Sequence, residues 1–581
     1  MKLASLIASL ILLVSFAQAK DRFLVQFKSE QGFKAMESYF NNTESTDSVM
    51  QKPLENVHAI VLNNANSNLV DRLKNHPEVD FVEAEYFIPS PKPVNGFKIS
   101  QVSIQKFEIA RRNKKPRQLN MGDLGSVPEF REGPATPWGI LAVNAGAAWS
   151  LSEAGTKARV LVLDTGIDAE HPSIAANFEK GKNFTAGDDG TVVDSDYQDR
   201  EGHGTHCSGT ILGVYDQKDG FTGVAPKAKL LMGRVCGAQG CSSIAIVEGI
   251  DWGIKEKVDV ISMSLGGPTG GSGSKQAVAR ADKAGIVVVA ASGNGASVPN
   301  YSHDRNDPKC GLDGPNACGI SFPAAYPTVV AVGALNSSLE KTDFSQWGPE
   351  LDVTAPGAAV VSSIPRGTGR ESKVTLTFGA TVMRVKSSAF GGTELFQTPV
   401  INNLVLVPGF GKPEDFAGLN IAGKFALISR GEIKFVEKVQ NALQVKVAGV
   451  VIYNNKPGLM QGSLSEDGTL LKIPVVMIQQ TDAAVVVAEL TKGTAVSAQI
   501  STSPSNYAAL DGTSMATPHV AGVVALIISA NKIVTPNKVL SPAQVRAILT
   551  STAKPLAPND TNQYGAGIVQ ADLAVRRAVG Q

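Results

Sequence analysis

Short apolar runs without polar alternation recur between Ala158 and Leu335, and each ends in glycine or a polar residue. The runs are ARVLVLDTG, AKLLMGRV, VDVISMSLGG, GIVVVAASGNG and PTVVAVGAL. Such runs are typical of strands in a parallel sheet that helices cover on both faces, so the predicted fold class is α/β. Ligand sites of these sheets form at the carboxyl ends of the strands, where Asp164, Ser264 and Asn294 stand.

A longer apolar run, Val520 to Ala530, predicts a helix that is buried on all sides, and GTSMATPHVAG leads into it. Pro518 is tolerated in a first turn but not in the middle of a helix, so we expect the helix to begin beside it. Ser514 then lies at a helix N-terminus, where unpaired amides favour an anion. A cap is the plainer role for a serine there, and chemistry at Ser514 requires a base elsewhere in the chain.

The first part of the chain has a different pattern. Residues 1–19 have an early lysine, an apolar stretch and a small-residue end, which is typical of a secretory signal peptide. Strands at Arg22–Ser29 and Glu55–Asn64, with helices near Gly32–Asn41 and Ser67–Asn75, predict a small α+β domain over residues 20–90. A linker follows over 91–135, and its basic run RRNKKPR is either a protease cleavage point or a solvated tether.

The α/β pattern is interrupted once more, near the C-terminal third. Short β-rich segments such as VTLTFGA, GKFALISRG and AGVVIYNN alternate with two helical stretches over 371–503, and the α/β pattern resumes at NYAALDGTSM. We therefore expect one domain over 136–367 and 504–581, with a second domain over 371–503 inserted in one of its surface loops.

Composition changes this picture little. The 581 residues are 43% hydrophobic and carry a formal net charge of +1, which gives no reason to expect nucleic acid or an anionic membrane as a partner. Of five cysteines, Cys236 with Cys241 and Cys310 with Cys318 flank short glycine-rich segments that disulfides would close, which leaves Cys207 over. A metal site is the rival interpretation, although clustered CxxC pairs are absent from the sequence.

Asp, His and Ser stand in similar surroundings, each at a glycine-flanked turn beside small residues. The motifs DTGID, GHGTHCSGT, SMSLGG, AASGNG and GTSMATPHVAG follow one another in the order found in the subtilisin-like serine proteases, the subtilases. TPWGI stands at the start of this region and YGAGIVQA at its end. The chain resembles that family over about residues 136–365 and 505–581.

The resemblance implies a triad of Ser514 as nucleophile, His203 as general base and acid, and Asp164 as the orienting carboxylate, with Asn294 as an oxyanion donor. These roles agree with the chemistry, because a serine hydroxyl near pH 7 needs an imidazole to take its proton. A buried carboxylate holds the required tautomer, and the tetrahedral oxyanion needs donors.

By the same resemblance, a substrate backbone would pair with one short segment, and a serine would line the base of the first pocket in place of a charge, giving a broad preference with an apolar lean. These residues are Ser264, Leu265, Gly266 and Gly267, and Ser321. Cys207 resembles the free thiol that some members carry beneath the catalytic histidine, although a buried, inert cysteine is the simpler interpretation.

The resemblance implies no cofactor for catalysis. A structural calcium ion is possible but has no matched site, since Ser173 stands where the family often has an aspartate, and Asp216 and Asp219 lie in an altered loop. Residues 20–90 resemble the family's inhibitory propeptide, and 371–503 resemble a protease-associated (PA) domain, either a gate for substrates or a passive insertion.

We therefore expect a monomeric, secreted serine endopeptidase made as an inactive precursor, extracellular or, in a bacterium with an outer membrane, periplasmic. Its partners would be protein or peptide substrates and its own propeptide. The alternative is a catalytically silent binding protein that uses the PA domain, against which the intact triad and oxyanion residues argue. A lipase or esterase would need a GxSxG turn, which the serine segment lacks.

Overall fold

In the computed structural model, the structure describes residues 22–42, 50–94, 129–185, 192–298, 301–307, 318–455, 459, 462, 464 and 469–581. The predicted signal peptide and the basic run at 111–117 lie outside these ranges. The chain divides into two compact units, of which the first ends at Tyr86 and the second begins at Phe87.

The first unit is an antiparallel sheet with two helices packed on one face. Its strand order is β2-β3-β1-β4. The core contains Val25 and Ile60 from the sheet, Phe33 from the first helix and Leu73 from the second. The two predicted strands and two predicted helices are present, as β1, β3, α1 and α2. The elements are β1 (Arg22–Phe27), α1 (Glu30–Asn42), β2 (Met50–Leu54), β3 (Ala59–Asn63), α2 (Ser67–Lys74) and β4 (Val79–Ala84).

The second unit is built on a parallel sheet of seven strands in the order β14-β13-β12-β11-β6-β8-β7. The apolar runs predict the five inner strands, but not the edge strands β14 and β7. Six of the strands are buried on both faces, with nearly every residue inaccessible to solvent, whereas the edge strand β7 is partly exposed. Its strands are β6 (Arg159–Asp164), β7 (Phe178–Asn183), β8 (Lys229–Arg234), β11 (Val260–Met263), β12 (Val287–Ala291), β13 (Val329–Leu335) and β14 (Val353–Pro356).

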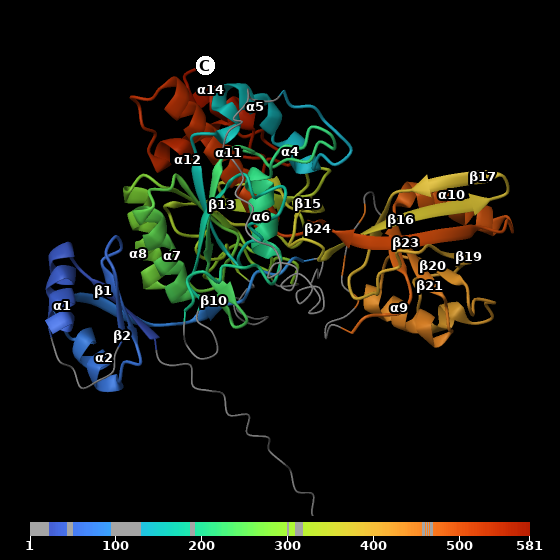
Figure 1. Ribbon diagram of the computed structural model, residues 1–581, viewed down its shortest axis with the longest axis horizontal. Helices are drawn as coiled ribbons and strands as arrows, with labels where there is room; N and C mark the ends of the chain where they lie inside the picture. Colours follow the sequence, from blue (N-terminus) through green and yellow to red (C-terminus); the bar gives the residue numbers. More distant parts are fainter. Residues whose placement is uncertain are drawn as a thin grey trace, which may run out of the picture. The chain divides into compact units, whose positions relative to one another are not determined.

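Helices cover both faces of this sheet (Figure 1). Val160 and Val162 of β6 belong to the core that contains α11, whereas Leu161 and Leu163 contact α7 on the opposite face. The helices are α4 (Trp138–Ala142), α5 (Ala145–Ser152), η1 (Glu153–Gly155), α6 (His203–Leu212), α7 (Ser243–Lys255), α8 (Ser272–Lys283), α11 (Thr513–Val534), α12 (Pro542–Thr552), α13 (Thr561–Tyr564) and α14 (Ala571–Ala578).

Helix α11 is the predicted buried helix, and it begins earlier than expected. It starts at Thr513, so Pro518 lies beyond the first turn instead of within it. The proline is tolerated because the carbonyl that it leaves without an intrahelical donor, that of Ser514, accepts side-chain hydrogen bonds. Helix α11 is long and apolar enough to cross a membrane, but its apolar window is wholly buried inside the unit, which is typical of a core helix.

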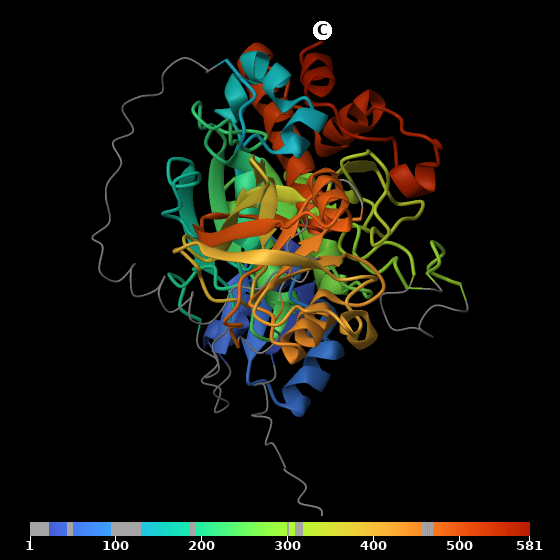
Figure 2. The same ribbon diagram turned by 90° about the vertical axis from the view of Figure 1, so that its right-hand side faces the viewer.

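The predicted insertion is an eight-stranded mixed sheet in the order β17-β16-β23-β19-β20-β21-β22-β18 (yellow to orange in Figure 2). Its two cores are separate from the core around α11. Its elements are β16 (Gly369–Phe378), β17 (Thr381–Val385), β18 (Ser387–Ala389), β19 (Val400–Leu406), η2 (Pro413–Phe416), β20 (Phe425–Ser429), α9 (Phe435–Gln444), β21 (Gly449–Tyr453), β22 (Val475–Ile478), α10 (Gln480–Thr491) and β23 (Ser497–Ser505).

A two-stranded stem joins the insertion to the α/β core. The stem consists of β15 (Val360–Ser363) and β24 (Tyr507–Leu510), which pair antiparallel. His206 of α6 contacts carbonyl oxygens of both strands through Nε2, that of Val360 at 2.9 Å and that of Ala508 at 3.2 Å. Burial lowers the pKa of His206 to about 3, so this imidazole is neutral. The stem is therefore fixed to the backbone of α6.

Candidate active site

Three neighbouring strands of the parallel sheet end in polar residues. Asp164 ends β6, Ser264 follows β11 and Asn294 comes shortly after β12. The strands lie side by side in the order β12-β11-β6, so the three residues gather at the carboxyl edge of the sheet, as the apolar pattern predicts.

The first residue of α6, His203, faces this edge. Its Nδ1 lies 2.8 Å from Asp164 Oδ1, and the two side chains are 2% and 0% exposed. Gly202, with φ of 90°, lets the chain turn sharply into the helix directly before the imidazole. Burial, the largest single influence, lowers the pKa of His203, but the interactions with Asp164 and Cys207 together outweigh it and hold the pKa well above its ordinary value.

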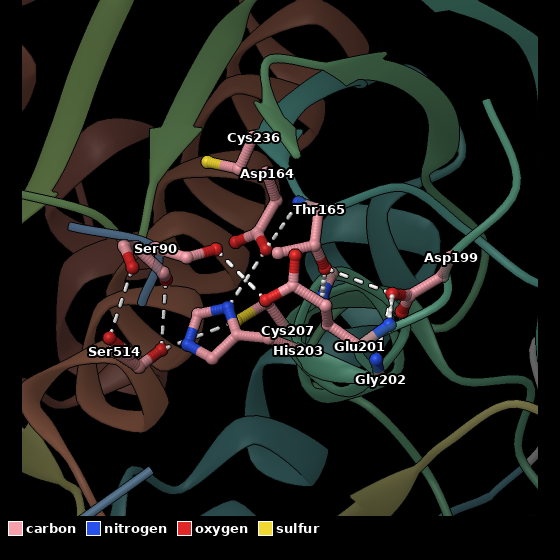
Figure 3. A network of polar contacts seen from close by, with 12 residues as sticks. Ser90, Asp164, Thr165, Asp199, Glu201, Gly202, His203, Cys207, Cys236 and Ser514 are labelled. Carbon is pink, nitrogen blue, oxygen red and sulfur yellow. Dashed lines mark hydrogen bonds and ion pairs between the residues drawn. The ribbon is translucent and has the colours of Figure 1, made fainter. Parts of the chain in front are cut away.

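Ser514 lies at the start of α11 and is held by Ser264. Its Oγ donates to the Ser264 carbonyl oxygen at 3.0 Å, and Ser264 Oγ donates back to the Ser514 carbonyl oxygen at 2.8 Å. His203 Nε2 has no hydrogen-bond partner. Figure 3 shows the imidazole between the Asp164 carboxylate and Ser514. A hydroxyl, a free imidazole nitrogen and a carboxylate thus meet in the order that nucleophilic catalysis requires.

Asn294 is oriented by the residue before this serine. Its Oδ1 accepts hydrogen bonds from Thr513 N and Thr513 Oγ1, both at 2.9 Å. Because both donors act on the oxygen, the Nδ2 donors of the amide are directed elsewhere. A Cβ on Gly512 would lie 3.4 Å from Nδ2, which places this NH₂ group over the entry to α11.

A buried carboxylate supports the turn before His203, and the sequence did not single it out. Asp199 accepts hydrogen bonds from Thr165 Oγ1 at 3.0 Å, Gly202 N at 2.7 Å and Thr205 Oγ1 at 2.6 Å. Burial raises the pKa of Asp199 above its ordinary value, although the hydrogen bonds from Thr205 and Gly202 act in the opposite direction. Its place in DREGHGTH, four residues before His203, was the available signal, but its role depends on Thr165, which is distant in sequence.

The cysteines follow the predicted pattern as far as the described residues reach. Cys236 and Cys241 form a disulfide, Cys318 is disulfide-bonded, and Cys310 lies outside the described residues. Cys207 is free and buried. Its Sγ donates to the Ser514 carbonyl oxygen at 3.4 Å and lies 3.8 Å from His203 Nδ1. Burial raises the pKa of this thiol, which keeps it neutral beneath the histidine.

Part of the segment expected to pair with a substrate backbone is already hydrogen-bonded within the protein. Both the N–H and the carbonyl of Gly267 bond to Phe322, at 2.9 Å each, and Leu265 is buried. Ser264 and Gly266 lie beside the candidate site. Ser321 lies against Gly266, and its N–H donates to the Ser292 carbonyl at 2.9 Å, close to the Asn294 turn.

An extended segment lies alongside the site and was not predicted as a strand. Strand β5 (Phe87–Ile88) pairs antiparallel with β10 (Gly240–Ser242), which in turn pairs with β9 (Cys236–Gly237) through the disulfide-bonded cysteines. Further along, Ser90 Oγ donates to Glu201 Oε2 at 2.9 Å, and Val94 N donates to the Asp511 carbonyl at 2.8 Å. The segment thus passes from β10 to the start of α11.

Family comparisons agree with this geometry. The Subtilase family model matches residues 155–393 and 447–567, and the PA domain model matches residues 397–486. The chain belongs to the subtilase family. The matched residues include Asp164, His203, Asn294 and Ser514, and the PA domain match falls within the predicted insertion.

Curated subtilases and a solved structure resemble the chain. It is 39% identical over 235 residues to subtilisin E of Bacillus subtilis (strain 168), a match that covers 40% of this chain and 55% of that protein. Subtilisin of Bacillus pumilus is 38% identical over 40% of this chain and 77% of its own length. The chain thus spans about half the length of subtilisin E.

The similar solved structure is the crystal structure of Apa1, a psychrophilic subtilisin-like protease from Pseudoalteromonas sp. AS-11. It covers 77% of this chain and 99% of its own, with a TM-score of 0.57 and 25% identity. This likeness extends well beyond the segment shared with the subtilisins.

A metal ion does not fit this subtilase site. Among the described residues, the metal-ligating side chains that lie close enough together are Asp164, His203 and Cys207, with ligand atoms within 4.8 Å. Two of them already share a hydrogen bond, and the thiol is not poised to ionise. Ser173, at the departure from the family's calcium ligand, bonds through Oγ to the Tyr507 hydroxyl at 2.7 Å.

Proposed function

We propose that this subtilase is a secreted serine endopeptidase, made as an inactive precursor, with Asp164, His203 and Ser514 as its catalytic triad. The observation that carries the proposal is the buried bond between His203 and Asp164, with the unpartnered Nε2 on the side of Ser514. Subtilases act through such side chains alone, and no cofactor enters the reaction.

The reaction begins when a peptide carbonyl lies beside Ser514. His203 Nε2 takes the hydroxyl proton as Oγ attacks the carbonyl carbon, and the imidazolium is stabilised by Asp164. The protonated histidine then gives this proton to the leaving amine, which leaves an acyl group on Ser514. Water, deprotonated by His203 in turn, releases the acyl group as the second product. For the hydroxyl to reach Nε2, it must exchange its bond to the Ser264 carbonyl.

The oxyanion that forms in each step needs donors that are already in place. Asn294 Nδ2 supplies one, because its Oδ1 is fixed by Thr513, and the Ser514 N–H at the start of α11 supplies the second. The positive end of the α11 dipole acts in the same direction. Preorganised donors of this kind stabilise the transition state without a cost of reorientation.

The segment at Phe87–Val94 supports the proposed precursor state. It is bonded to β10, to Glu201 and to Asp511, so it occupies the path along which an extended substrate would approach Ser514. Residues 22–84 fold as a separate unit ahead of it, in keeping with a propeptide domain. Activity then requires that the chain be cut and this segment released.

A catalytically silent binding protein that uses the PA domain is the second candidate. It is favoured by the large sheet of the insertion, which has its own cores. The intact arrangement around Ser514 favours the enzyme, because a binding protein has no need of an imidazole nitrogen kept free beside a serine.

The test is to express the whole precursor, its Ser514→Ala variant and, as a matched control on the same helix, Ser529→Ala. Chain length and casein cleavage are followed over time. We expect the wild type and Ser529→Ala to shed the N-terminal region and digest casein, whereas Ser514→Ala does neither. The loss should be about 10⁶-fold in turnover, the size known for the serine of subtilisin, a member of this family.

If the precursor stays intact, trypsin is used to cut the linker, and fluorophosphonate labelling then reports whether Ser514 is reactive. Labelling of the wild type alone supports the protease and assigns maturation to another enzyme. A trypsin-cut wild type that neither labels nor cleaves casein overturns the proposal in favour of the binding protein.

A further inference from the structure

A carboxylate stands next to the triad without a role in the mechanism. Glu201 lies two residues before His203, in the loop that Asp199 supports, and it is half-buried. Figure 3 shows its side chain between His203 and Ser90, the residue that donates a hydrogen bond to it.

Ser90 marks the place where a substrate side chain would lie. It belongs to the extended segment that begins with β5, in which alternate side chains face the same way. The Ile88 side chain faces the protein and lies so close to Gly267 that a Cβ there would approach Ile88 Cγ2 to 2.7 Å. Ser90, two residues on, also faces the protein, where its hydroxyl meets Glu201.

The charge of Glu201 is not neutralised locally. Among the described residues, no lysine or arginine forms an ion pair with it. Arg234, a basic group in the same region, is directed at Asp196 through Nη1 at 3.1 Å. Asp164 and Asp199 add negative charge on the side of the triad, while His203 offsets part of it. A side chain that enters this place therefore meets a net negative environment.

We propose that Glu201 is a specificity-determining residue, which favours substrates with a cationic side chain, lysine or arginine, at the position that Ser90 occupies. The inference deepens the proposed function and rests on it. A serine hydroxyl makes only a neutral hydrogen bond to the carboxylate, whereas an ammonium or guanidinium group makes a charge-assisted one, which is roughly twice as strong.

The same reasoning explains how the precursor segment is released. With serine at this position, the segment engages Glu201 by one weak bond, and a cationic substrate competes favourably for the carboxylate. Acidic side chains are rejected, because like charges repel in a partly buried place.

The experiment uses the processed enzyme and fluorogenic peptides at pH 8. Each of the four positions before the scissile bond is varied in turn among Lys, Arg, Ser, Leu and Glu. At one position, we expect Lys or Arg to exceed Leu by about tenfold in kcat/KM, equivalent to about 1.4 kcal/mol, with Glu the poorest.

Two variants assign the preference to this carboxylate. Glu201→Gln removes the charge and keeps the shape, so the preference for Lys should vanish while cleavage of the Leu peptide persists. Glu201→Lys should favour Glu at the same position. Glu432→Gln, an exposed glutamate in the insertion that pairs with Lys412, is the matched control and should leave the profile unchanged.

The outcomes separate this inference from the proposed function. An active wild type without a cationic preference at any position overturns the role of Glu201 and leaves the protease intact. An unchanged preference in Glu201→Gln does the same. If the Glu201 variants fail to fold, Ser90→Lys in the full precursor is the deciding variant. It should be activated more slowly than the wild-type precursor. Activation at an equal or faster rate overturns the inference. A wild type that cleaves no peptide overturns both proposals.

Discussion

The arrangement around Ser514 depends on side chains whose polar atoms nearly all have a hydrogen-bond partner or a proposed role. Asn294 uses its oxygen on Thr513, which leaves its NH₂ for an oxyanion, and Ser264 fixes Ser514 by two reciprocal bonds. Pro518 makes the second of these possible, because it leaves the Ser514 carbonyl without a helical donor. The same residue that looks like a defect in α11 thus contributes to the position of Ser514.

Replacing Asn294 separates its two roles. Asn294→Ala should lower kcat by about 10²- to 10³-fold, the range known for removing such a donor in subtilisin, a member of this family, with little change in KM. Asn294→Asp keeps the acceptor for Thr513 but removes the donor and adds a repelling charge, so it should lose at least as much. The exposed Asn306→Ala is the control, and an Asp variant with near-normal kcat would contradict the oxyanion role.

The raised pKa of His203 has a consequence for the pH dependence. The base must be neutral, so kcat/KM should fall as the pH drops through a pKa that lies above the ordinary histidine value of about 6.5. In Asp164→Asn, burial acts without the opposing charge, so the acid limb should move to lower pH. Turnover should also fall by several orders of magnitude. A pH–rate profile of both proteins tests this, and a limb that moves upward contradicts it.

At the scale of single residues, the sequence singles out the proposed triad, but not the residues that support it. Asp164, His203 and Ser514 stand in motifs whose glycines and small residues are themselves informative. Glu201 and Asp199 stand in the same stretch as His203, but the residues that give them a role, Ser90 for Glu201 and Thr165 for Asp199, are distant in sequence. Such long-range partners appear only once the chain is folded.

At the scale of elements, the inner parallel strands can be predicted from continuous apolar runs. A strand that is buried on both faces is apolar throughout, so no alternation of polar residues obscures it. Strand β5 was missed for the opposite reason: FIPSPKP is rich in proline, which argues against a strand, and the segment pairs over only two residues. The start of α11 was misplaced because the proline rule takes no account of side chains from elsewhere that bond to a freed carbonyl.

The β9–β10 hairpin offers a test at this scale. Its disulfide joins Cys236 to Cys241, and β10 carries the segment that lies beside the triad. Replacing both cysteines by alanine should lower the free energy of unfolding by about 2 to 3 kcal/mol, measured by denaturant in the Ser514→Ala background. In the active protein, KM should rise while kcat stays close to normal. A lowered kcat with unchanged KM would contradict this division of roles.

At the scale of the whole molecule, the chain combines folding units with separate cores. The first unit, the α/β core and the insertion each bury their own apolar residues. The sequence predicts this division because the pattern of apolar and polar residues changes at each domain boundary. The stem that closes the insertion has no such signal in the sequence. Ser362 Oγ donates to the His206 carbonyl and Ser363 Oγ to the Thr205 carbonyl, so α6 supports the stem without the insertion.

Removing the insertion tests this independence. Gly369 and Ser505 are paired in register, so residues 370–504 can be replaced by a two-residue Asn-Gly turn. We expect the shortened protein to cleave a short peptide with kcat/KM within about threefold of normal, because Asp164, His203, Asn294 and Ser514 and their hydrogen-bond partners all lie outside the deleted stretch. A matched deletion that also removes β15 and β24 should abolish activity. Loss of activity in the first variant would show that the insertion supports catalysis.

The closed stem also bears on how such a chain changes over evolutionary time. Because its two strands are bonded to one another and to α6, the ends of the intervening segment stay together whatever sequence lies between them. Insertions, deletions or exchanges of sequence confined to that interval can change the module without requiring compensating substitutions in the core. The stem is therefore a fixed attachment point at which modules can be exchanged while the α/β core keeps its own sequence.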